Sequence, residues 1–229
     1  MEENSLDLKT LVTGLEWISD QRIAIGFIDG FFLIYDVENK QKIFSKTDAG
    51  PFSSFYFHSA DNSLFLSCFD SKIIWKFDLN QQEFSIFCED EDFSKCNKTI
   101  HVTNKRFIVI KRKNIYFYKL STKELLLKYN FPSKVSAFDI NAGLLCVVFQ
   151  EGKEFFPLII QINDIYQNQE SLELLIQEFK KQDKSKDSNL ILNSKPICVK
   201  MNAEKKVLCI STEEPKVFLY DVIFDENSG

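Results

Sequence analysis

The sequence predicts an all-β protein built from a repeated unit of about 40 residues. Short apolar runs recur along the chain, and each ends in an aromatic or aliphatic residue followed by a polar one. Phe, Ile, Val and Tyr are frequent in these runs, and such residues favour strands over helices. Turn signals such as Asp29-Gly30 and Asp61-Asn62 separate the runs. The chain is therefore expected to fold mostly as short strands.

The repeat is clearest at the polar ends of these runs. The ends are Tyr35-Asp36, Phe77-Asp78, Tyr118-Lys119, Ile162-Asn163 and Tyr220-Asp221. Successive ends are 42, 41, 44 and 58 residues apart, so only the last interval is long. A polar, Lys-rich insertion at 164–188, within the fourth unit, explains the extra length.

Each unit contains two further apolar strands before this run. The first places apolar residues at i, i+3 and i+5 in three units and is blurred in the other two: Val12/Leu15/Trp17, Phe52/Phe55/Phe57, Val135/Phe138/Ile140, Ile100/Val102 and Val199/Met201. The second lies at 23–25, 64–66, 107–110, 144–148 and 207–210. A fourth, more polar strand follows in three units, at 42–46, 83–87 and 124–129.

Three apolar strands followed by a polar one is the pattern that a blade of a β-propeller requires. Inner strands are covered on both faces by neighbouring blades, whereas the outermost strand faces water. A lone four-stranded sheet cannot cover both of its faces, so such units must stack around an axis. The sequence predicts a single propeller domain over 1–229 with about five four-stranded blades.

The repeat resembles that of the WD40 family, most clearly in residues 12–36. The first strand, the short second strand, the Asp-Gly turn and the Ile-Tyr-Asp ending all match that repeat. The motifs are degenerate, because no unit has Gly-His and Trp-Asp is replaced by Tyr35-Asp36, Phe77-Asp78 and Tyr220-Asp221. The resemblance implies that residues 5–11 pair beside 216–221 to close the ring. A larger ring lacking two blades, or an open ring completed by a partner, are the alternatives.

The insertion departs from the strand pattern. Leu172, Leu175, Ile176 and Phe179 stand at i, i+3, i+4 and i+7, which predicts one face of a helix that begins near Asn168 or Ser171. Lys180 and Lys181 follow it, and 188–192 is expected to return as the fourth strand of the fourth blade. The apolar face can pack on the domain, on a partner protein or on a membrane. These six residues, from Leu172 to Lys181, are the candidate partner-binding site.

The membrane alternative comes from a weaker resemblance to PROPPIN propellers, which bind phosphoinositides and carry a membrane-contacting loop between outer strands. Residues 105–110 and 115–118 are similar to the second blade of that family. The family's lipid sites depend on a Phe-Arg-Arg-Gly motif, which does not occur in this sequence. The resemblance therefore implies the fold more than the lipid sites.

Composition and motifs argue against other classes of function. A net charge of −5 without a long basic tract disfavours nucleic acid as a partner. The N-terminus lacks a secretory signal and no stretch has the roughly 20 apolar residues of a membrane span, so a cytoplasmic location and reduced, mostly buried cysteines are expected. His58 and His101 are interpreted as structural, and no phosphate loop, metal spacing or catalytic set occurs. We expect no enzyme activity, no cofactor and no metal.

The function predicted from these observations is that of a non-catalytic WD40-like scaffold, bound to other protein subunits in a larger complex. The alternative is a PROPPIN-like propeller recruited to membranes in autophagy or trafficking. The sequence by itself names neither the partner nor the pathway.

Overall fold

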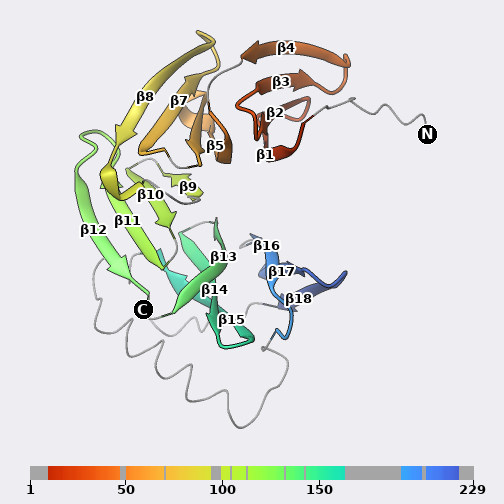
Figure 1. The fold of residues 1–229 in the computed structure, drawn as a ribbon, viewed down its shortest axis with the longest axis vertical. Helices are drawn as coiled ribbons and strands as arrows, with labels where there is room; N and C mark the ends of the chain where they lie inside the picture. The colour runs from red at the N-terminus through yellow and green to blue at the C-terminus, as the bar shows by residue number, and fades with distance from the viewer. Residues whose placement is uncertain are drawn as a thin grey trace. The chain divides into compact units, whose positions relative to one another are not determined.

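The computed structural model describes residues 10–46, 50–69, 71–93, 99–103, 105–111, 113–131, 133–141, 143–162, 192–202 and 205–221 (Figure 1). These residues form 18 strands and two short 3-10 helices, Ser59–Asp61 and Glu91–Phe93. The chain divides into two compact units. The first unit comprises Met1–Lys111 and Ile115–Lys128, and the second comprises Arg112–Asn114 and Tyr129–Gly229.

The first unit contains two complete four-stranded sheets and most of a third. The strands of the first sheet are β1 (Val12–Trp17), β2 (Arg22–Phe27), β3 (Phe32–Asp36) and β4 (Gln41–Lys46). Those of the second are β5 (Phe52–His58), β6 (Ser63–Cys68), β7 (Ile73–Asp78) and β8 (Glu83–Glu89). Those of the third are β9 (Thr99–Val102), β10 (Arg106–Lys111), β11 (Asn114–Lys119) and β12 (Leu125–Asn130).

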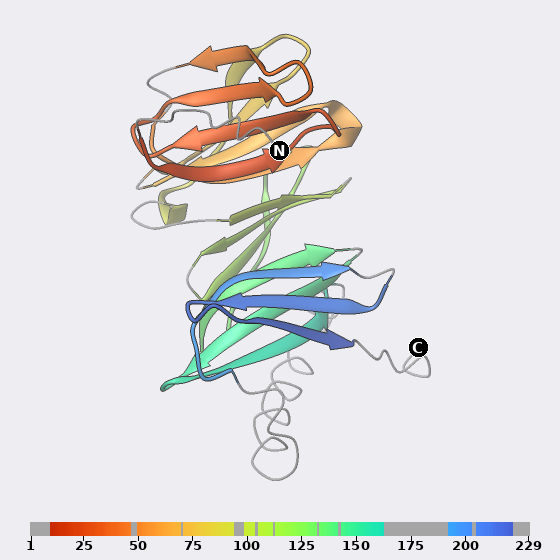
Figure 2. The ribbon, with the colours of Figure 1, turned by 90° about the vertical axis from the view of Figure 1, so that its right-hand side faces the viewer.

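The second unit contains the fourth and fifth sheets, each with three strands among the described residues. The fourth has β13 (Lys134–Asn141), β14 (Leu144–Glu151) and β15 (Glu154–Gln161). The fifth has β16 (Pro196–Asn202), β17 (Val207–Thr212) and β18 (Val217–Asp221). Figure 2 shows the fifth sheet in blue over the fourth in green, and β13 and β16 are neighbours. All five sheets are ordered as they follow in the chain, which is the pattern of successive hairpins.

A β-bulge recurs in the first strand of four sheets and explains the unusual apolar spacing. The register shifts between Val12 and Gly14, Phe52 and Ser54, Val135 and Ala137, and Pro196 and Cys198. One extra residue on the bulged strand resets the alternation of side chains, so that residues i and i+3 face the same way. The i, i+3, i+5 pattern read from the sequence is thus the signature of a bulged strand.

The turns after the third strands also repeat. The residue that follows the third strand donates its N–H to a turn carbonyl between the first two strands in four sheets: Val37 to Gln21 at 2.7 Å, Leu79 to Asn62 at 3.1 Å, Leu120 to Lys105 at 3.1 Å and Ile162 to Gly143 at 2.9 Å. The Asp of the Tyr-Asp or Phe-Asp ending stabilises the next turn. Asp36 accepts the backbone N–H of Asn39 at 2.8 Å, which holds the pKa of Asp36 below its ordinary value, and Asp78 accepts those of Asn80 and Gln81.

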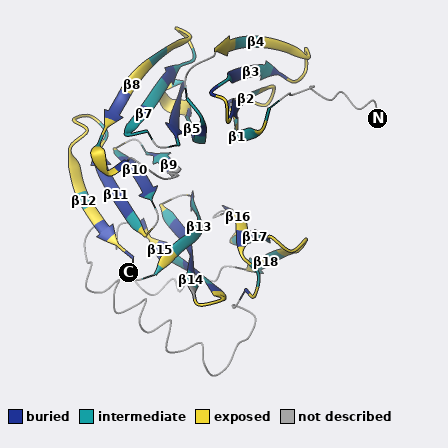
Figure 3. Cartoon of the chain, in the orientation of Figure 1, coloured by how far each residue is buried: buried dark blue, intermediate teal, exposed yellow. Residues whose placement is uncertain are grey.

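Apolar side chains fill the space between neighbouring sheets within each unit. Phe32, Phe52, Phe55 and Phe77 belong to the cluster between the first and second sheets. Phe65, Phe87 and Phe107 belong to the next cluster. In the second unit one cluster joins the fourth and fifth sheets. The inner strands β6 and β10 are largely buried. Figure 3 shows the outer strands β4, β8 and β12 largely exposed, as the polar fourth strands predict.

The predicted repeat is therefore confirmed for the first three sheets and only in part for the others. Leu192, from the predicted fourth strand at 188–192, exchanges two backbone hydrogen bonds with Phe155 of β15, at 3.0 and 2.9 Å. The rest of that strand lies outside the described residues, as do the insertion at 164–188 and residues 5–9 of the predicted closing strand. Leu11, at the end of that strand, accepts a hydrogen bond from Ile28 at 3.0 Å and so extends the pairing of β1 with β2.

The cysteines are less uniformly buried than expected. Cys68, Cys88 and Cys146 are buried, Cys209 is half-buried and Cys198 is exposed, and these five form no disulfide with one another. Cys198 follows the bulge of β16 and points away from the cluster that buries its neighbour Val199. The described part of the chain holds no helix with the length and hydropathy that a membrane span requires.

Burial of Cys146 makes stability depend on pH in the alkaline range. Burial, aided by the charge of Asp139, raises the pKa of Cys146 to about 12, above the value near 8.5 of an unfolded thiol. The unfolded chain therefore releases its proton first, so this contribution is complete below pH 8.5 and is lost as the pH rises toward 12. By pH 10 the loss is about 2 kcal/mol. Urea unfolding followed by circular dichroism should show a shallower decline for Cys146→Ala than for the parent chain, and equal slopes would contradict this.

Candidate interaction surface

The outer face of the first sheet, which is turned away from the second sheet, is an unusually apolar surface. Paired residues of neighbouring strands share a face. The register places Trp17 beside Ile23 and Tyr35, and Leu15 beside Ile25 and Leu33, with Val12 completing this face. Ile25, Phe27 and Leu33 are buried and form a small cluster there. Leu15 and Trp17, in contrast, are 58% and 55% exposed.

The corresponding residues of the second sheet differ in burial from those of the first sheet. Counted from the bulge, Leu15 and Trp17 occupy the positions of Phe55 and Phe57. Phe55 is only 8% exposed, because the opposite face of the first sheet covers it. The outer face of the first sheet thus has the composition of an inter-sheet core but two exposed members, Leu15 and Trp17. Isolated exposed apolar residues are ordinary, whereas a clustered apolar face indicates an interaction site.

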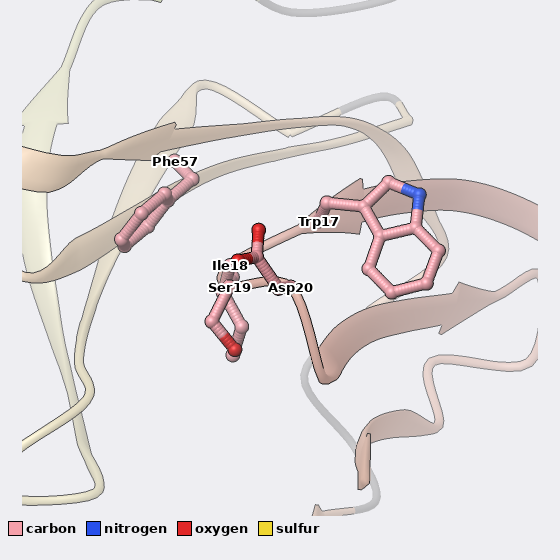
Figure 4. A pocket seen from close by; sticks show the side chains of 5 residues that line it. All are labelled: Trp17, Ile18, Ser19, Asp20 and Phe57. Carbon is pink, nitrogen blue, oxygen red and sulfur yellow. The ribbon is translucent and has the colours of Figure 1, made fainter. Parts of the chain in front are cut away.

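A depression of about 480 Å³ lies beside Trp17, at the edge between the first and second sheets. Trp17, Ile18, Ser19, Asp20 and Phe57 line it, and in Figure 4 the rings of Phe57 and Trp17 flank the three turn residues. The Ser19 hydroxyl accepts the N–H of Arg22 at 3.1 Å, and the Ile18 N–H is bonded to the Arg22 carbonyl at 3.0 Å. These bonds hold the turn between β1 and β2, so the depression has a fixed wall with one carboxylate, that of Asp20.

A carboxylate links the first strands of adjacent sheets beside this depression. The Glu16 Oε1 accepts the backbone N–H of Phe57 at 3.3 Å. In the second unit, Asp139 at the equivalent position of β13 accepts the N–H of Met201 at 2.8 Å, and Lys200 Nζ lies 3.2 Å from its other oxygen. In both cases the acidic residue is bonded to the first strand of the next sheet. The residue bonded there lies one position further from the bulge than the acidic residue does in its own strand. The recurrence indicates a structural role that fixes the spacing of first strands.

Replacing Asp139 with alanine is expected to destabilise the protein by about 1–3 kcal/mol, because the N–H of the buried Met201 loses its acceptor. The exposed Lys200 ion pair adds little. Asp139→Asn retains an acceptor oxygen and should lose less than the alanine variant. Equal losses in the two variants, measured by thermal unfolding, would contradict this role.

The two histidines, His58 and His101, each contact other side chains of the first unit. His58 contacts Asp61, whose other oxygen pairs with Lys76 at 2.7 Å. Burial raises the pKa of Asp61, but the hydrogen bonds from Lys76 and His58 outweigh it, so the net pKa is lowered. The His101 ring lies edge-on to Tyr56 with centroids 4.5 Å apart. Neither histidine lines the depression at Trp17.

The carboxylates of the acidic run at residues 89–92 are bonded to other side chains of the first unit. Glu89 pairs with Lys72 at 2.7 Å, Asp92 pairs with Lys128 at 2.7 Å, and Asp90 accepts the Tyr118 hydroxyl at 2.8 Å. Within the described ranges, no group of three His, Cys, Asp or Glu side chains is arranged to hold a metal ion. The run therefore acts as a set of ion pairs between strands and turns.

The partner-binding residues expected from the sequence, Leu172, Leu175, Ile176, Phe179, Lys180 and Lys181, lie outside the described residues. The exposed pair on the first sheet was not expected. Its sequence pattern matches that of the covered first strands and so predicts burial at all of them alike. Exposure depends on what lies against a sheet, and the apolar spacing carries no such information.

Comparison with known proteins identifies the fold. No family model and no curated protein matches the sequence. Among solved structures, the computationally designed protein Ika8 matches with a TM-score of 0.58 and 10% identity, over 92% of this chain and 58% of that one. Hsv2 of Kluyveromyces lactis matches with a TM-score of 0.56 and 9% identity, over 93% and 61%. Hsv2 of Kluyveromyces marxianus matches with a TM-score of 0.56 and 10% identity, over 93% and 59%.

These matches confirm the family resemblance at the level of structure, since they are WD40-like propellers and include a PROPPIN. Identities near 10% show the fold alone. The chain spans about three fifths of the length of these propellers, from 58% to 61% for the three compared. The five small antiparallel sheets of this chain thus have the fold of a WD40-like β-propeller.

Proposed function

We propose that this protein is a non-catalytic propeller scaffold that binds protein partners as a subunit of a larger assembly. The observation that carries the proposal is the outer face of the first sheet, where Leu15 and Trp17 are more than half exposed beside a cluster of buried apolar residues. Tryptophan is among the residues that contribute most to binding when a partner excludes water from it, and the neighbouring leucine adds apolar area to the contact. The polar wall with Ser19 and Asp20 provides a rim.

Affinity capture of the tagged chain from native extract tests this proposal. The parent chain should retain a stoichiometric set of proteins, and a Leu15→Ser/Trp17→Ser variant should retain at least about tenfold less, a loss of 1.4 kcal/mol or more. Ile86→Ser is the matched control, because Ile86 is an equally exposed apolar residue, at 52%, on β8 of the same unit. Undiminished retention by the double variant, with its thermal stability intact, would refute the proposed site.

The segment predicted from the sequence forms a second part of the proposal. Replacing Leu175, Ile176 and Phe179 with polar residues should reduce the captured proteins without changing thermal stability, because a partner and not the domain would bury these side chains. A loss of stability in this variant would assign the three residues to the protein's own core instead.

The alternative is a propeller that is recruited to membranes. The likeness of this chain to Hsv2 supports the shared fold and gives no support for lipid binding. The lysines on which it depends, Lys180, Lys181, Lys184 and Lys186, are outside the described residues. We therefore propose the protein-binding scaffold in preference to a lipid-binding propeller.

A further inference from the structure

We propose that the outer face of the first sheet binds the fifth sheet of a second copy of this chain. Leu15 of one copy would lie against Cys198 and Ser211 of the other. The inference deepens the proposed function, on which it rests, by naming the partner of the exposed face. The support for it is that equivalent positions of the first, second and fifth sheets carry similar side chains on the described faces.

The packing of the first sheet on the second provides the reference. Gly14 on β1 and Gly26 on β2 are paired, and the Phe55 ring of the second sheet lies against both. A Cβ at Gly26 would stand 2.3 Å from Phe55 Cζ, and one at Gly14 would stand 3.2 Å from Phe55 Cε2. A large side chain of one first strand thus enters a hollow between two small residues of the neighbouring sheet. The third strand borders this hollow with Phe32, which is paired with Gly26.

The outer face of the fifth sheet, which is turned away from the fourth, repeats this arrangement. Cys198, Ser211 and Val217 are paired in a row and correspond to Gly14, Gly26 and Phe32, counted from the bulge. The next row contains Lys200, Cys209 and Leu219, which correspond to Glu16, Ala24 and Ile34. Small residues again lie on the second strand of the sheet, and larger apolar residues again lie on the third.

This face is exposed where its counterpart on the first sheet is buried. Val217 and Leu219 are 63% and 70% exposed, whereas Phe32 and Ile34 are 0% and 3% exposed. Cys198 is exposed, and Cys209 and Ser211 are half-buried. The fifth sheet therefore presents a hollow between small residues with an aliphatic border. The outer face of the first sheet presents Leu15 and Trp17, at the positions of the residues that fill such a hollow in the first unit.

The proposed contact between copies has a lysine, Lys200, where the contact between the first and second sheets has a glutamate, Glu16. This difference weakens the contact between copies. Glu16 accepts a backbone N–H of the neighbouring sheet, but its counterpart Lys200 cannot accept one and instead pairs with Asp139. The contact between copies consequently lacks the carboxylate link that joins sheets within each unit. Association is expected to be reversible and dependent on concentration. Because each copy offers one face of each kind, the contact is heterologous and can repeat from copy to copy or close on itself.

A thiol cross-link across the proposed contact provides the test. A short bismaleimide should join Leu15→Cys to the native Cys198 in the purified full chain. In the equivalent pair the ring of Phe55, beyond its Cβ, contacts Gly14, so two thiols at these positions need a linker between them. Ile86→Cys is the control, since its site is equally exposed but lies on β8. Mixing unlabelled and ¹⁵N-labelled protein before cross-linking identifies, by mass spectrometry, cross-links that join two copies.

The expected result is a cross-link between positions 15 and 198 that joins labelled and unlabelled chains and exceeds the control. A cross-link confined to single chains, or none above the control, overturns the proposal. Sedimentation velocity should further show association of the parent chain that weakens about tenfold or more in Leu219→Glu and is unchanged in Leu126→Glu. A parent chain that stays monomeric at every concentration also overturns it.

Failure of this inference is separable from failure of the proposed function. A monomeric purified chain whose capture of other proteins still requires Leu15 and Trp17 would refute the second copy and leave the scaffold proposal intact. Cross-linked copies that retain no other protein from extract would support the second copy and refute membership of a larger assembly.

Discussion

Phe32→Ala is expected to lower the free energy of unfolding of the first unit by about 3–5 kcal/mol. The Phe32 side chain is fully buried. Five aromatic rings surround it at centroid distances of 5.3 to 6.0 Å: Phe44, Phe52, Phe55, Phe77 and Phe84. Truncation would remove its burial and its edge-to-face contacts and leave a cavity that rings fixed by two sheets cannot close.

Tryptophan fluorescence during urea unfolding measures this loss in the first unit alone. The chain has two tryptophans, Trp17 and Trp75, and both belong to that unit. Phe32→Leu, which keeps most of the apolar volume, should lose much less, and Ile86→Ala at an exposed site should be nearly neutral. An alanine variant of Phe32 that loses under about 1 kcal/mol would show that the aromatic cluster is not the core of the unit.

Gly26→Ala should destabilise the same unit by about 1–3 kcal/mol. The added Cβ would stand 2.3 Å from Phe55 Cζ and 3.0 Å from Phe52 Cβ, so either the ring or the strand must move. The sign is informative, because exchanging glycine for alanine within a strand would otherwise gain about 0.5–1 kcal/mol. A stabilised variant would therefore contradict the close approach of the first and second sheets.

Two further variants separate the clash from other effects at Gly26. Gly14→Ala meets Phe55 at 3.2 Å and should cost much less. Phe55→Leu shortens the obstructing side chain, so the combined Gly26→Ala/Phe55→Leu variant should lose less than the sum of the single losses. Additive losses in a double-mutant cycle would show that Phe55 does not cause the effect.

The repeated strands could be predicted because local chemistry determines them. The bulge in the first strand of four sheets forces apolar residues into the spacing seen at Val12, Leu15 and Trp17, and that spacing is visible in the sequence. The Asp of the Tyr35-Asp36 ending is likewise visible because it accepts N–H groups only three residues away. Strand order within each sheet followed, since successive hairpins place neighbours in the chain beside one another.

The interaction surface could not be predicted because it depends on distant parts of the chain. Leu15 and Phe55 have the same place in the repeat, and only the sheet that covers Phe55 distinguishes them. The carboxylate links from Glu16 and Asp139 join residues 41 and 62 positions away, and a single acid in a strand gives no indication of such a partner. The exposure of Cys198 could not be predicted either, because the apolar residues around it conceal which face of the bulged strand it occupies.

A photoreactive residue at position 15 provides the most direct test of the central claim that the outer face of the first sheet binds protein. Benzoylphenylalanine replaces Leu15 in the tagged full chain, and Ile86 in a control chain, before irradiation in native extract. We expect a discrete protein adduct from position 15 that is absent from position 86. No adduct from position 15, or the same adducts from both positions, would contradict the claim.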